Sequence, residues 1–178
     1  MDAPRPGFGY DSCMKHPLYT IGYEGAAIEP FVLTLKKAGV KTLIDVRDVP
    51  ISRKKGFSKN TLRMTLADNG IDYVHLKGLG DPKAGRAAAR AGRYNRFRTI
   101  FAKHMRTNAA QVDLKVLEGL AEKRPVALMC FEHDHCCCHR SIVASALVSL
   151  TGQTVHNLIV DKALFDHASF CQRSTAAA

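Results

Sequence analysis

The sequence predicts a single α/β domain in which a mostly parallel sheet of about five strands carries helices on both faces. Three observations support this fold class. Short apolar runs alternate with segments of helical periodicity along most of the chain, as in successive strand–helix units. Two runs, TLIDVR and PVALMCF, are nearly continuous in apolar residues, which is typical of parallel strands covered on both faces. The length of 178 residues suits one domain with a substantial core.

The first half of the predicted domain contains two strand–helix units and a third strand. Ile28, Phe31, Val32 and Leu35 recur at the spacing of one helical face. Ser58 has a side chain that is common at helix N-caps. The elements expected, in order, are a strand at residues 18–23, a helix closed by Gly39, a strand at 42–47, a basic loop at 48–57, a helix that ends near 69–70, and a strand with its exit loop at 71–80.

The second half alternates helices and strands in the same way. Phe97 and Phe101 lie four residues apart, which supports a helix over 94–105. The elements expected, in order, are an irregular or partly helical segment at 82–92, the helix at 94–105, a helix marked by Val112, Val116, Leu117 and Leu120, a strand at 125–131, a helix with an apolar face at Ile142, Val143, Ala146, Leu147 and Leu150, and a strand at 154–160.

Domain boundaries and location follow from composition. Residues 1–17 are rich in Pro and Gly and are expected to be a flexible extension, 18–160 to be the α/β domain, and 161–178 to be a tail or a short helix. No apolar run reaches the roughly 20 residues of a membrane helix, and the N-terminus lacks the apolar segment of a signal peptide. We therefore expect a cytoplasmic protein without a membrane partner, in which the six cysteines are reduced.

The charge is concentrated in one segment. The net charge is +10, and residues 82–112 contain no acidic residue. A block of this kind favours contact with a polyanion such as nucleic acid, although it also occurs on ordinary solvated surfaces. The residues predicted to bind nucleic acid are Lys83, Arg86, Arg90, Arg93 and Arg96, within a basic segment that extends to Arg106.

Polar residues follow each predicted strand. In parallel α/β sheets, ligands bind beyond the carboxyl ends of the strands. Tyr23 and Glu24 follow the first strand, Asp45 and Arg47 end the second, and His75 ends the third. The fourth strand leads into the stretch CFEHDHCCCHRS, residues 130–141. These segments are therefore expected to meet in one polar site.

Four blocks in this order resemble the domain-of-unknown-function 488 family: TIGYEG, DVRDVPISRKKGFSKNTL, YVHLKGLG, and CFE with CHR. The resemblance spans residues 19–150 and implies the fold and a site, but no reaction. Cys136 and Cys137 depart from the family, which usually has one cysteine before the final His-Arg pair, and the segment between Gly80 and Tyr94 is unusually rich in Ala and Arg. The site residues that the resemblance implies are Tyr23, Glu24, Asp45, Arg47, Pro50, Ser52, Arg53, Phe57, His75, Leu79, Gly80, Cys138, His139 and Arg140.

The favoured interpretation of this site is anion binding. A helix that begins near Arg140 would offer free backbone N–H groups, and Arg140 could clamp a phosphate with two hydrogen bonds. Arg47 and Arg53 could converge on the same anion, and His75 or His139 could transfer protons near neutral pH. The alternative for the arginines is a buried ion pair with one of the neighbouring acidic residues.

Metal binding and thiol chemistry remain open alternatives. Cys130, Cys136, Cys138 and His139 could bind a metal, but three consecutive cysteines rarely share one ion. Carboxylates such as those of Glu24 and Asp45 could instead hold Mg²⁺. Cys138 at a helix N-terminus is expected to favour the thiolate, although the segment has no room for the long anion-cradling loop of thiol phosphatases. The cofactor therefore stays unassigned, with a divalent metal as one option.

The sequence thus predicts a protein that binds a phosphate-bearing ligand, preferably a nucleotide or nucleic acid, with an enzymatic role left open. The rival functions are a non-catalytic nucleic-acid-binding module that uses the basic segment 83–106, and a metal-binding or thiol-redox protein that uses residues 130–139. The predicted catalytic residues are Glu24, Asp45, Cys138 and His139, and the predicted substrate-binding residues are Tyr23, Arg47, Ser52, Arg53, His75 and Arg140.

Overall fold

All five strands of the sheet run parallel, in the spatial order β3-β2-β4-β1-β5. The computed structural model describes residues 15–160. The fourth strand in the chain lies at the centre of the sheet, between the first and the second. The strands are β1 (Leu18–Gly22), β2 (Thr42–Asp45), β3 (Asp72–His75), β4 (Val126–Cys130) and β5 (Val155–Leu158).

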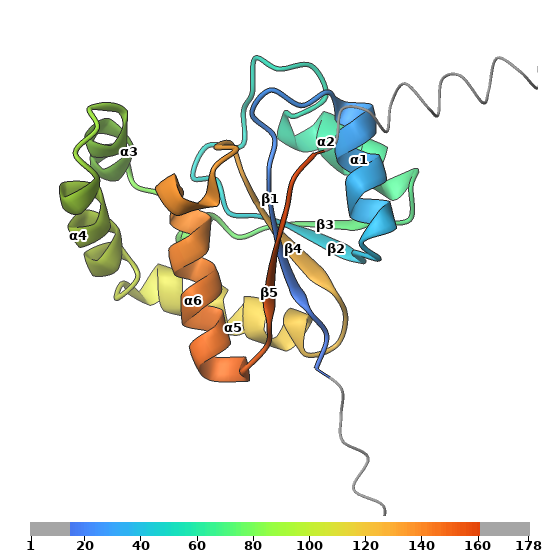
Figure 1. Cartoon of the computed structure of the whole chain (residues 1–178). Helices are drawn as coiled ribbons and strands as arrows, with labels where there is room; N and C mark the ends of the chain where they lie inside the picture. Colours follow the sequence, from blue (N-terminus) through green and yellow to red (C-terminus); the bar gives the residue numbers. More distant parts are fainter. Residues whose placement is uncertain (1–14, 161–178) are drawn as a thin grey trace, which may run out of the picture.

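Helices cover both faces of this sheet, so the predicted three-layer α/β fold is confirmed (Figure 1). Helices α1 and α2 lie on one face, and α5 and α6 lie on the other. The pair α3 and α4 stands beside α6, away from the strands. The helices are α1 (Ile28–Lys37), α2 (Lys59–Ala67), α3 (Lys83–Arg90), α4 (Tyr94–His104), α5 (Asn108–Ala121) and α6 (His139–Thr151), with single 3₁₀ turns η1 (Lys77–Leu79) and η2 (His135–Cys137).

The central strands explain why their sequences are apolar on both sides. Successive side chains of a strand point to opposite faces of the sheet. Leu43 accordingly packs with α1 and α2 in one apolar core, whereas Ile44 packs with the helices of the other core. In β4, Met129 likewise packs in the core with α1 and α2, and Leu128 packs in the other core. Each layer of helices therefore has its own core, and the strands supply side chains to both.

The structure differs from the predicted elements at two helices. Residues 83–90 form a regular helix, α3, where we expected an irregular or partly helical segment. In α5 the buried face consists of Ala110, Leu114, Leu117 and Ala121, so Val112 and Val116 are exposed. The alanines let this helix approach its neighbours closely, and the larger valines are left on the outer side.

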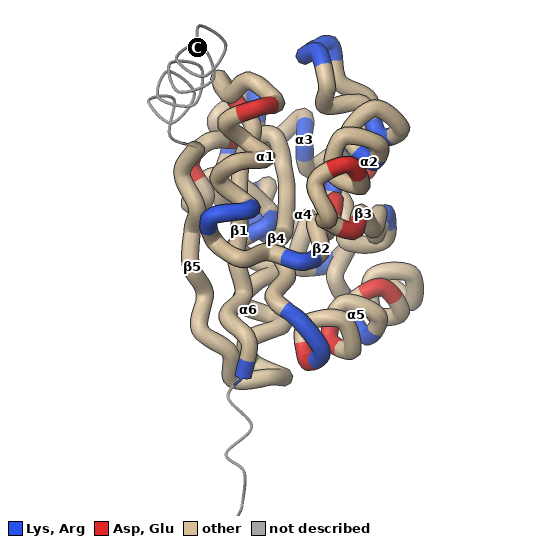
Figure 2. The backbone as a smooth tube through the Cα atoms, turned by 90° about the vertical axis from the view of Figure 1, so that its right-hand side faces the viewer, with Lys and Arg blue, Asp and Glu red and all other residues tan. Residues whose placement is uncertain are grey.

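The loop before α2 is tied down by a serine pair. Ser58 occupies the N-cap position of α2, as predicted, but its hydroxyl does not cap the helix. The Ser58 hydroxyl donates to the carbonyl oxygen of Ser52 at 3.0 Å and accepts from the Ser52 backbone N–H at 3.2 Å. These two bonds close the basic loop, which projects from the rim of the molecule above α2 (Figure 2).

The predicted tail at 161–178 and most of the predicted extension at 1–17 lie outside the described residues. Within residues 15–160, no helix combines the length and the apolar character needed to cross a bilayer.

Candidate functional site

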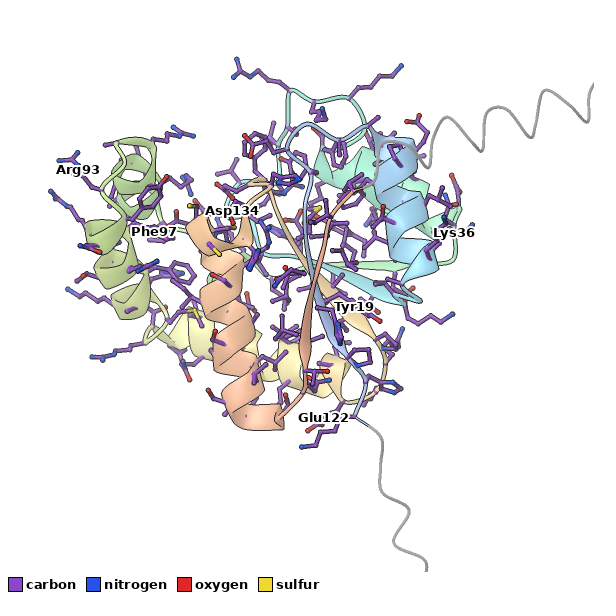
Figure 3. The ribbon with its side chains drawn as sticks, viewed as in Figure 1. Tyr19, Lys36, Arg93, Phe97, Glu122 and Asp134 are labelled. Carbon is purple, nitrogen blue, oxygen red and sulfur yellow. The ribbon has the colours of Figure 1, made fainter. Side chains whose placement is uncertain are left out.

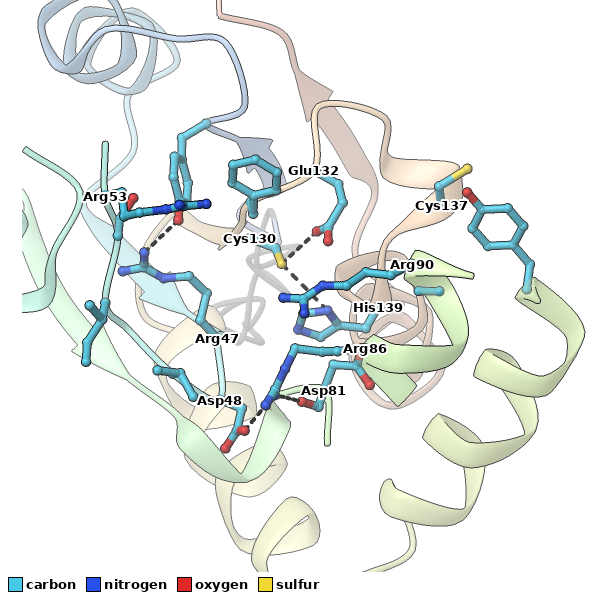
Figure 4. Close-up of a pocket in the computed structure, with 17 residues that line it drawn as sticks. Arg47, Asp48, Arg53, Asp81, Arg86, Arg90, Cys130, Glu132, Cys137 and His139 are labelled. Atoms are coloured by element: carbon cyan, nitrogen blue, oxygen red, sulfur yellow. Dashed lines mark hydrogen bonds and ion pairs between the residues drawn. The ribbon is translucent and has the colours of Figure 1, made fainter. Parts of the chain in front are cut away.

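A cavity of about 540 Å³ opens at the carboxyl edge of the sheet (Figure 4). Its walls come from the segments that follow β1, β2 and β4 and from α3 and the start of α4. This is the edge at which parallel α/β sheets bind their ligands. The basic side chains in its lining are Arg47, Arg53, Arg86, Arg90 and His139, and the acidic ones are Asp48, Asp81 and Glu132.

Arg47 and Asp45 form a buried ion pair beneath one wall of this pocket. The Asp45 side chain is fully buried and that of Arg47 is 6% exposed, with 2.6 Å between Arg47 Nη2 and Asp45 Oδ2. Arg47 also donates to the Tyr23 hydroxyl and to the carbonyl of Phe57, each at 2.9 Å. The Tyr73 hydroxyl donates to Asp45 Oδ2 at 2.6 Å. Because Asp45 is fully engaged, this geometry fits a structural role better than the predicted proton transfer.

The pKa shifts around the Asp45–Arg47 pair also support a structural role for it. Burial by itself lowers the pKa of Arg47. The hydrogen bond and charge of the Asp45 carboxylate, with a smaller effect of Tyr23, together outweigh burial and raise this pKa above its ordinary value, so the guanidinium keeps its charge. Burial and the Asp45 charge also raise the pKa of the Tyr73 hydroxyl. Arg47 therefore places a permanent positive charge at the wall of the pocket.

Arg140 is buried and forms hydrogen bonds with the backbone. Its side chain is 1% exposed. Its guanidinium donates to the carbonyl oxygens of Glu132 and His133, and more weakly to the Thr20 hydroxyl at 3.4 Å. A buried guanidinium must satisfy its donors, and here protein oxygens do so. The structure therefore does not fit the predicted phosphate clamp, because Arg140 fixes the loop after β4.

Two further residues hold the same loop in place. At Gly22, a Cβ atom would lie 1.9 Å from the carbonyl oxygen of Glu132, so only glycine allows this close approach. Glu24 is exposed, and its carboxylate accepts a 2.9 Å hydrogen bond from the backbone N–H of His133. Glu24 is not part of the pocket lining, which places it as a brace for the loop instead of the predicted proton-transfer residue.

Four potential metal ligands meet at the floor of the pocket, of which Cys130, Glu132 and His139 line it and Cys138 is buried outside the lining. The Cys130 and Cys138 thiols lie 3.0 and 3.1 Å from Glu132 Oε2. His139 Nδ1 lies 3.6 Å from the sulfur of Cys130 and 3.9 Å from that of Cys138. All four ligand atoms lie within 4.8 Å of one another. We call these four residues the Cys-His-Glu cluster.

Two parts of the chain supply the four residues of the cluster: the end of β4 with the loop that follows it, and the start of α6. Cys130 ends β4, and Glu132 lies on the loop that Arg140 holds. Cys138 is the N-cap of α6 and His139 is the first residue of that helix. His139 Nε2 lies 2.8 Å from the carbonyl oxygen of Val46, which requires a proton on this nitrogen and turns Nδ1 toward the sulfur atoms.

Both thiols of the cluster have a raised pKa. Burial and the neighbouring Cys130 raise the pKa of Cys138 well above its ordinary value. Contact with Cys138 lowers the pKa of Cys130, but burial and the charge of Glu132 outweigh it, so this pKa is raised as well. The helix N-terminus thus does not produce the predicted reactive thiolate at Cys138, because the thiol is removed from water.

The acid and the base of the cluster hold charge. Burial by itself would raise the pKa of Glu132, but hydrogen bonds from Cys130, the backbone and Cys138 lower it below its ordinary value. Burial would lower the pKa of His139, but Cys138, the Val46 carbonyl and Glu132 raise it to about 9. The floor of the pocket therefore carries an anionic carboxylate beside a basic imidazole.

Asp81 is a buried acid that also lines the pocket, near His139 and Arg86 (Figure 4). It is 6% exposed, and within the described residues its Oδ1 atom has no hydrogen-bond partner. Burial raises the pKa of Asp81 to about 6, against the opposing effects of His139 and Arg86. Arg86 itself forms a 2.6 Å ion pair with Asp48 and donates to the backbone carbonyl of Asp81. This ion pair joins α3 to the segment that follows β2.

The structure brings some of the predicted catalytic and ligand-binding residues together at the pocket and leaves others outside it. Tyr23, Arg47, Ser52, Arg53 and His139 line the pocket, as do Arg86 and Arg90 from the predicted nucleic-acid-binding set. Three predicted nucleic-acid-binding residues are exposed and lie outside the pocket lining: Lys83 on α3, Arg93 between α3 and α4, and Arg96 on α4. His75 also lies outside it, where its Nε2 contacts the carbonyl oxygen of Arg47 at 2.8 Å and its Nδ1 lies 3.3 Å from the Lys59 amine.

Sequence reasoning missed three acids of the pocket: Asp48, Asp81 and Glu132. Glu132 is absent from the predicted metal set, in which Cys136 stood in its place. In the structure Cys136 is exposed and lies outside the Cys-His-Glu cluster, whereas Glu132 completes it. Asp81 carried one signal, since it is the last acid before the acid-free segment.

Comparison with known proteins places the chain in a family. No curated protein and no solved structure matches it. The model of one family, described as "Domain of unknown function DUF488", matches residues 27–147, which include both sides of the pocket and the whole Cys-His-Glu cluster. This match confirms the resemblance found in the sequence, and the chain belongs to the DUF488 family.

Proposed function

We propose that the pocket binds a phosphate-bearing ligand, and specifically a nucleotide. The observation that carries this proposal is that Arg53 and Arg90 line the pocket and, within residues 15–160, form no ion pair. They approach from different elements, Arg53 from the loop before α2 and Arg90 from the end of α3. Two arginines without acidic partners at one cavity favour an anion, since guanidinium groups pair well with phosphate oxygens.

An apolar wall beside these arginines supports a nucleotide in preference to free phosphate. Ile51 is 76% exposed at this wall and Phe131 is 45% exposed. The Phe131 ring meets the Tyr23 ring edge to face, with 5.3 Å between centroids. A nucleobase could lie against this wall while its phosphate reaches the arginines, because aromatic and aliphatic surfaces favour flat apolar groups.

The exposed basic residues of α3 and α4 extend the proposal to nucleic acid. Arg93 points away from the body of the protein, while Phe97 faces it (Figure 3). The phosphate backbone of an oligonucleotide would cross this outer face, and its end would enter the pocket at Arg90. Contacts of this kind are electrostatic and weaken steeply with salt.

Calorimetric titration with nucleoside monophosphates and with inorganic phosphate tests the nucleotide proposal. We expect Arg53→Gln and Arg90→Gln each to weaken nucleotide binding by roughly tenfold, the effect of losing one charge-assisted contact. Arg98→Gln is the matched control, because Arg98 is exposed on α4 outside the pocket lining, and it should leave the affinity unchanged. Absence of nucleotide binding by the wild-type protein at low salt would refute the proposal.

Fluorescence anisotropy with short DNA and RNA oligonucleotides tests the extension to nucleic acid. A variant with Arg93, Arg96 and Lys103 replaced by Gln should lose oligonucleotide binding yet retain mononucleotide binding. If the Gln variant and the wild type bind oligonucleotides alike across a salt series, the outer face of α3 and α4 takes no part.

A further inference from the structure

We propose that Cys130, Glu132, Cys138 and His139 bind one zinc ion at the floor of the pocket. This site goes beyond the proposed nucleotide binding and does not depend on it.

The spacing of the four ligand atoms suits a tetrahedral ion. Zinc bonds of about 2.3 Å to sulfur and about 2.0–2.1 Å to nitrogen or oxygen put tetrahedral neighbours roughly 3.3–3.8 Å apart. The distances from Glu132 Oε2 to the two sulfurs are 3.0 and 3.1 Å, and those from His139 Nδ1 are 3.6 and 3.9 Å. Shifts of a few tenths of an ångström would therefore admit the ion.

The donor types select zinc among the common divalent ions. Two thiolates and an imidazole are ligands for zinc, whereas Mg²⁺ and Ca²⁺ prefer oxygen alone. This ligand set differs from the two metal sites considered from the sequence. It lacks Cys136, which was part of the predicted Cys/His site, and it has one carboxylate, whereas the predicted Mg²⁺ site used several. Glu132 adds one oxygen, which zinc also accepts.

His139 is oriented as a metal-binding histidine. Its Nε2 is held by the Val46 carbonyl oxygen at 2.8 Å, so Nδ1 faces the two sulfurs and the carboxylate. Metal-bound histidines almost always donate their second ring N–H to a carbonyl, a carboxylate or water in this manner. The backbone at the end of β2 thus fixes the direction of the ligand atom.

The partners of Glu132 are an independent indication of a ligand. Among the side chains of residues 15–160, only the Cys130 and Cys138 thiols donate to its Oε2, and thiols are weak donors. Among residues 15–160, no lysine or arginine forms an ion pair with this carboxylate. Protein interiors seldom leave a half-buried carboxylate with such poor partners, because the charge loses hydration. A bound cation would be a stronger partner for this carboxylate than the two thiols are.

The loop that carries Glu132 is held before any ion binds. Arg140 holds the carbonyl oxygens of Glu132 and His133, and Gly22 leaves room for the first of these. The remaining ligands stand at the end of a central strand and at the start of a helix. Such a preorganised site loses little conformational entropy when it binds an ion.

Two rival uses of the same segment are separable by experiment. Asp134, His135 and Cys136 form a second group with ligand atoms close together, but Asp134 and Cys136 are exposed and the group offers three donors. Alternatively, Cys130 and Cys138 could form a disulfide, although the expected cytoplasmic location would keep them reduced. Each rival predicts a different response to cysteine substitution.

The first experiment measures zinc in protein purified without a histidine tag, by elemental analysis after extensive dialysis. We expect close to one zinc per chain in the wild type. A variant with Cys130→Ser and Cys138→Ser should lose at least about 90% of the bound zinc, since each ligand contributes tenfold or more to affinity. The matched control, Cys136→Ser with Cys137→Ser, removes two nearby cysteines outside the cluster and should keep full occupancy.

The second experiment guards against a variant that fails to fold. Co²⁺ is added to wild-type protein stripped with a chelator, and the visible spectrum is recorded. We expect sulfur-to-cobalt charge transfer and the intense bands of a tetrahedral ion, with competition by zinc. Glu132→Gln keeps both thiols and should weaken Co²⁺ binding by about tenfold while the charge-transfer band persists.

Three outcomes would overturn the proposal. Loss of zinc from the Cys136 and Cys137 variant alone would assign the ion to the exposed group. A wild-type mass lower by two hydrogens, without zinc, would assign Cys130 and Cys138 to a disulfide. Reduced wild-type protein that binds neither Co²⁺ nor zinc would leave no metal site. All three readouts are taken without nucleotide, so they stand apart from failure of the proposed function.

Discussion

Arg140 shows at the scale of one residue how a basic side chain near a ligand pocket can serve the fold. Its charge is satisfied by backbone carbonyls, so its loss would leave the loop after β4 without its brace. We expect Arg140→Lys to lower the free energy of unfolding by about 2–4 kcal/mol, because lysine keeps the charge but cannot reach several acceptors at once. Urea unfolding measures this change.

Arg98→Lys is the control for that substitution. Arg98 is exposed on α4, where a surface exchange should alter stability by less than about 0.5 kcal/mol. An Arg140→Lys variant as stable as wild type would show that the guanidinium is not needed by the fold, and would return Arg140 to the list of candidate anion ligands.

Asp81 gives a prediction for the dependence of stability on pH. Its pKa of about 6 in the folded protein exceeds the ordinary value of 3.8, chiefly because of burial. The folded state therefore binds the proton more tightly than the unfolded state, and Asp81 makes stability fall as pH rises from about 4 to about 6. His139, Arg86 and His104 oppose this effect, and Glu132 adds to it.

We expect Asp81→Asn to remove this part of the pH dependence and to stabilise the protein above pH 6. Urea unfolding of chelator-treated protein between about pH 4 and 8 measures both effects. Asp68→Asn, at an exposed acid, should follow the wild-type curve. A lower stability of Asp81→Asn at neutral pH would show that the ionised carboxylate has a partner that stabilises the fold.

The positions of single residues were only partly predictable from the sequence. The carboxyl ends of parallel strands meet at one edge, so Tyr23, Arg47 and His139 could be placed near one another in advance. Whether each side chain faces the pocket depends on which partners satisfy its charge or its hydrogen bonds, and those partners follow from the folded structure. Asp45 pairs with Tyr73 and Arg140 with the Glu132 carbonyl, and neither pair has a sequence signal.

Helix α3 illustrates the scale of one element, since its sequence alone was ambiguous. Its alanines favour a helix, whereas Gly85 in its interior disfavours one. The structure gives a reason for the glycine, because a Cβ atom at this position would lie 2.0 Å from Oδ1 of Asp81. A helix packed against a buried carboxylate needs a small residue at that point.

We therefore expect Gly85→Ala to destabilise the protein, although alanine is the better helix former by about 1 kcal/mol. In an Asp81→Ala background the same substitution should stabilise, because the clash is gone. Gly119→Ala in α5 is the matched control and should stabilise by up to about 1 kcal/mol, since no atom of residues 15–160 beyond its chain neighbours and its own helix backbone lies within 4 Å of its Cβ position. Thermal unfolding of the four variants measures these differences, and stabilisation by Gly85→Ala alone would contradict the explanation.

Strands were easier to predict than helix faces for a physical reason. A strand covered on both sides must be apolar at every position, and this run is visible in the sequence of β4. A helix buries one stripe, and several stripes of α5 contain apolar residues. The stripe that is buried depends on which neighbours it meets, so Val112 and Val116 could not be distinguished from Leu114 beforehand.

At the scale of the whole molecule, burial is unequal across the sheet. Every residue of β2 and β4 is buried, whereas the residues of the edge strand β5 are mostly exposed. Local opening needs less free energy where few apolar groups are buried. We expect amide hydrogens to exchange slowest in β2 and β4, faster in β3, and fastest in β5.

Hydrogen exchange followed by mass spectrometry measures this order. Exchange in β5 as slow as that in β4 would show that an unseen contact protects the edge strand. The sequence predicted the number of strands and their parallel direction, but not their spatial order, because the order depends on which crossovers the helices make.

The central place of β4 has a consequence for the synthesis of the chain. Strands β1 and β2 emerge first from the ribosome, but they do not pair with each other, since β4 lies between them in the finished sheet. A nascent chain that ends before Val126 therefore has no continuous sheet, and it lacks all four residues of the Cys-His-Glu cluster. The insertion of β4 joins the two sides of the sheet, and the residues of the Cys-His-Glu cluster take their places at its end and in the segment that follows it.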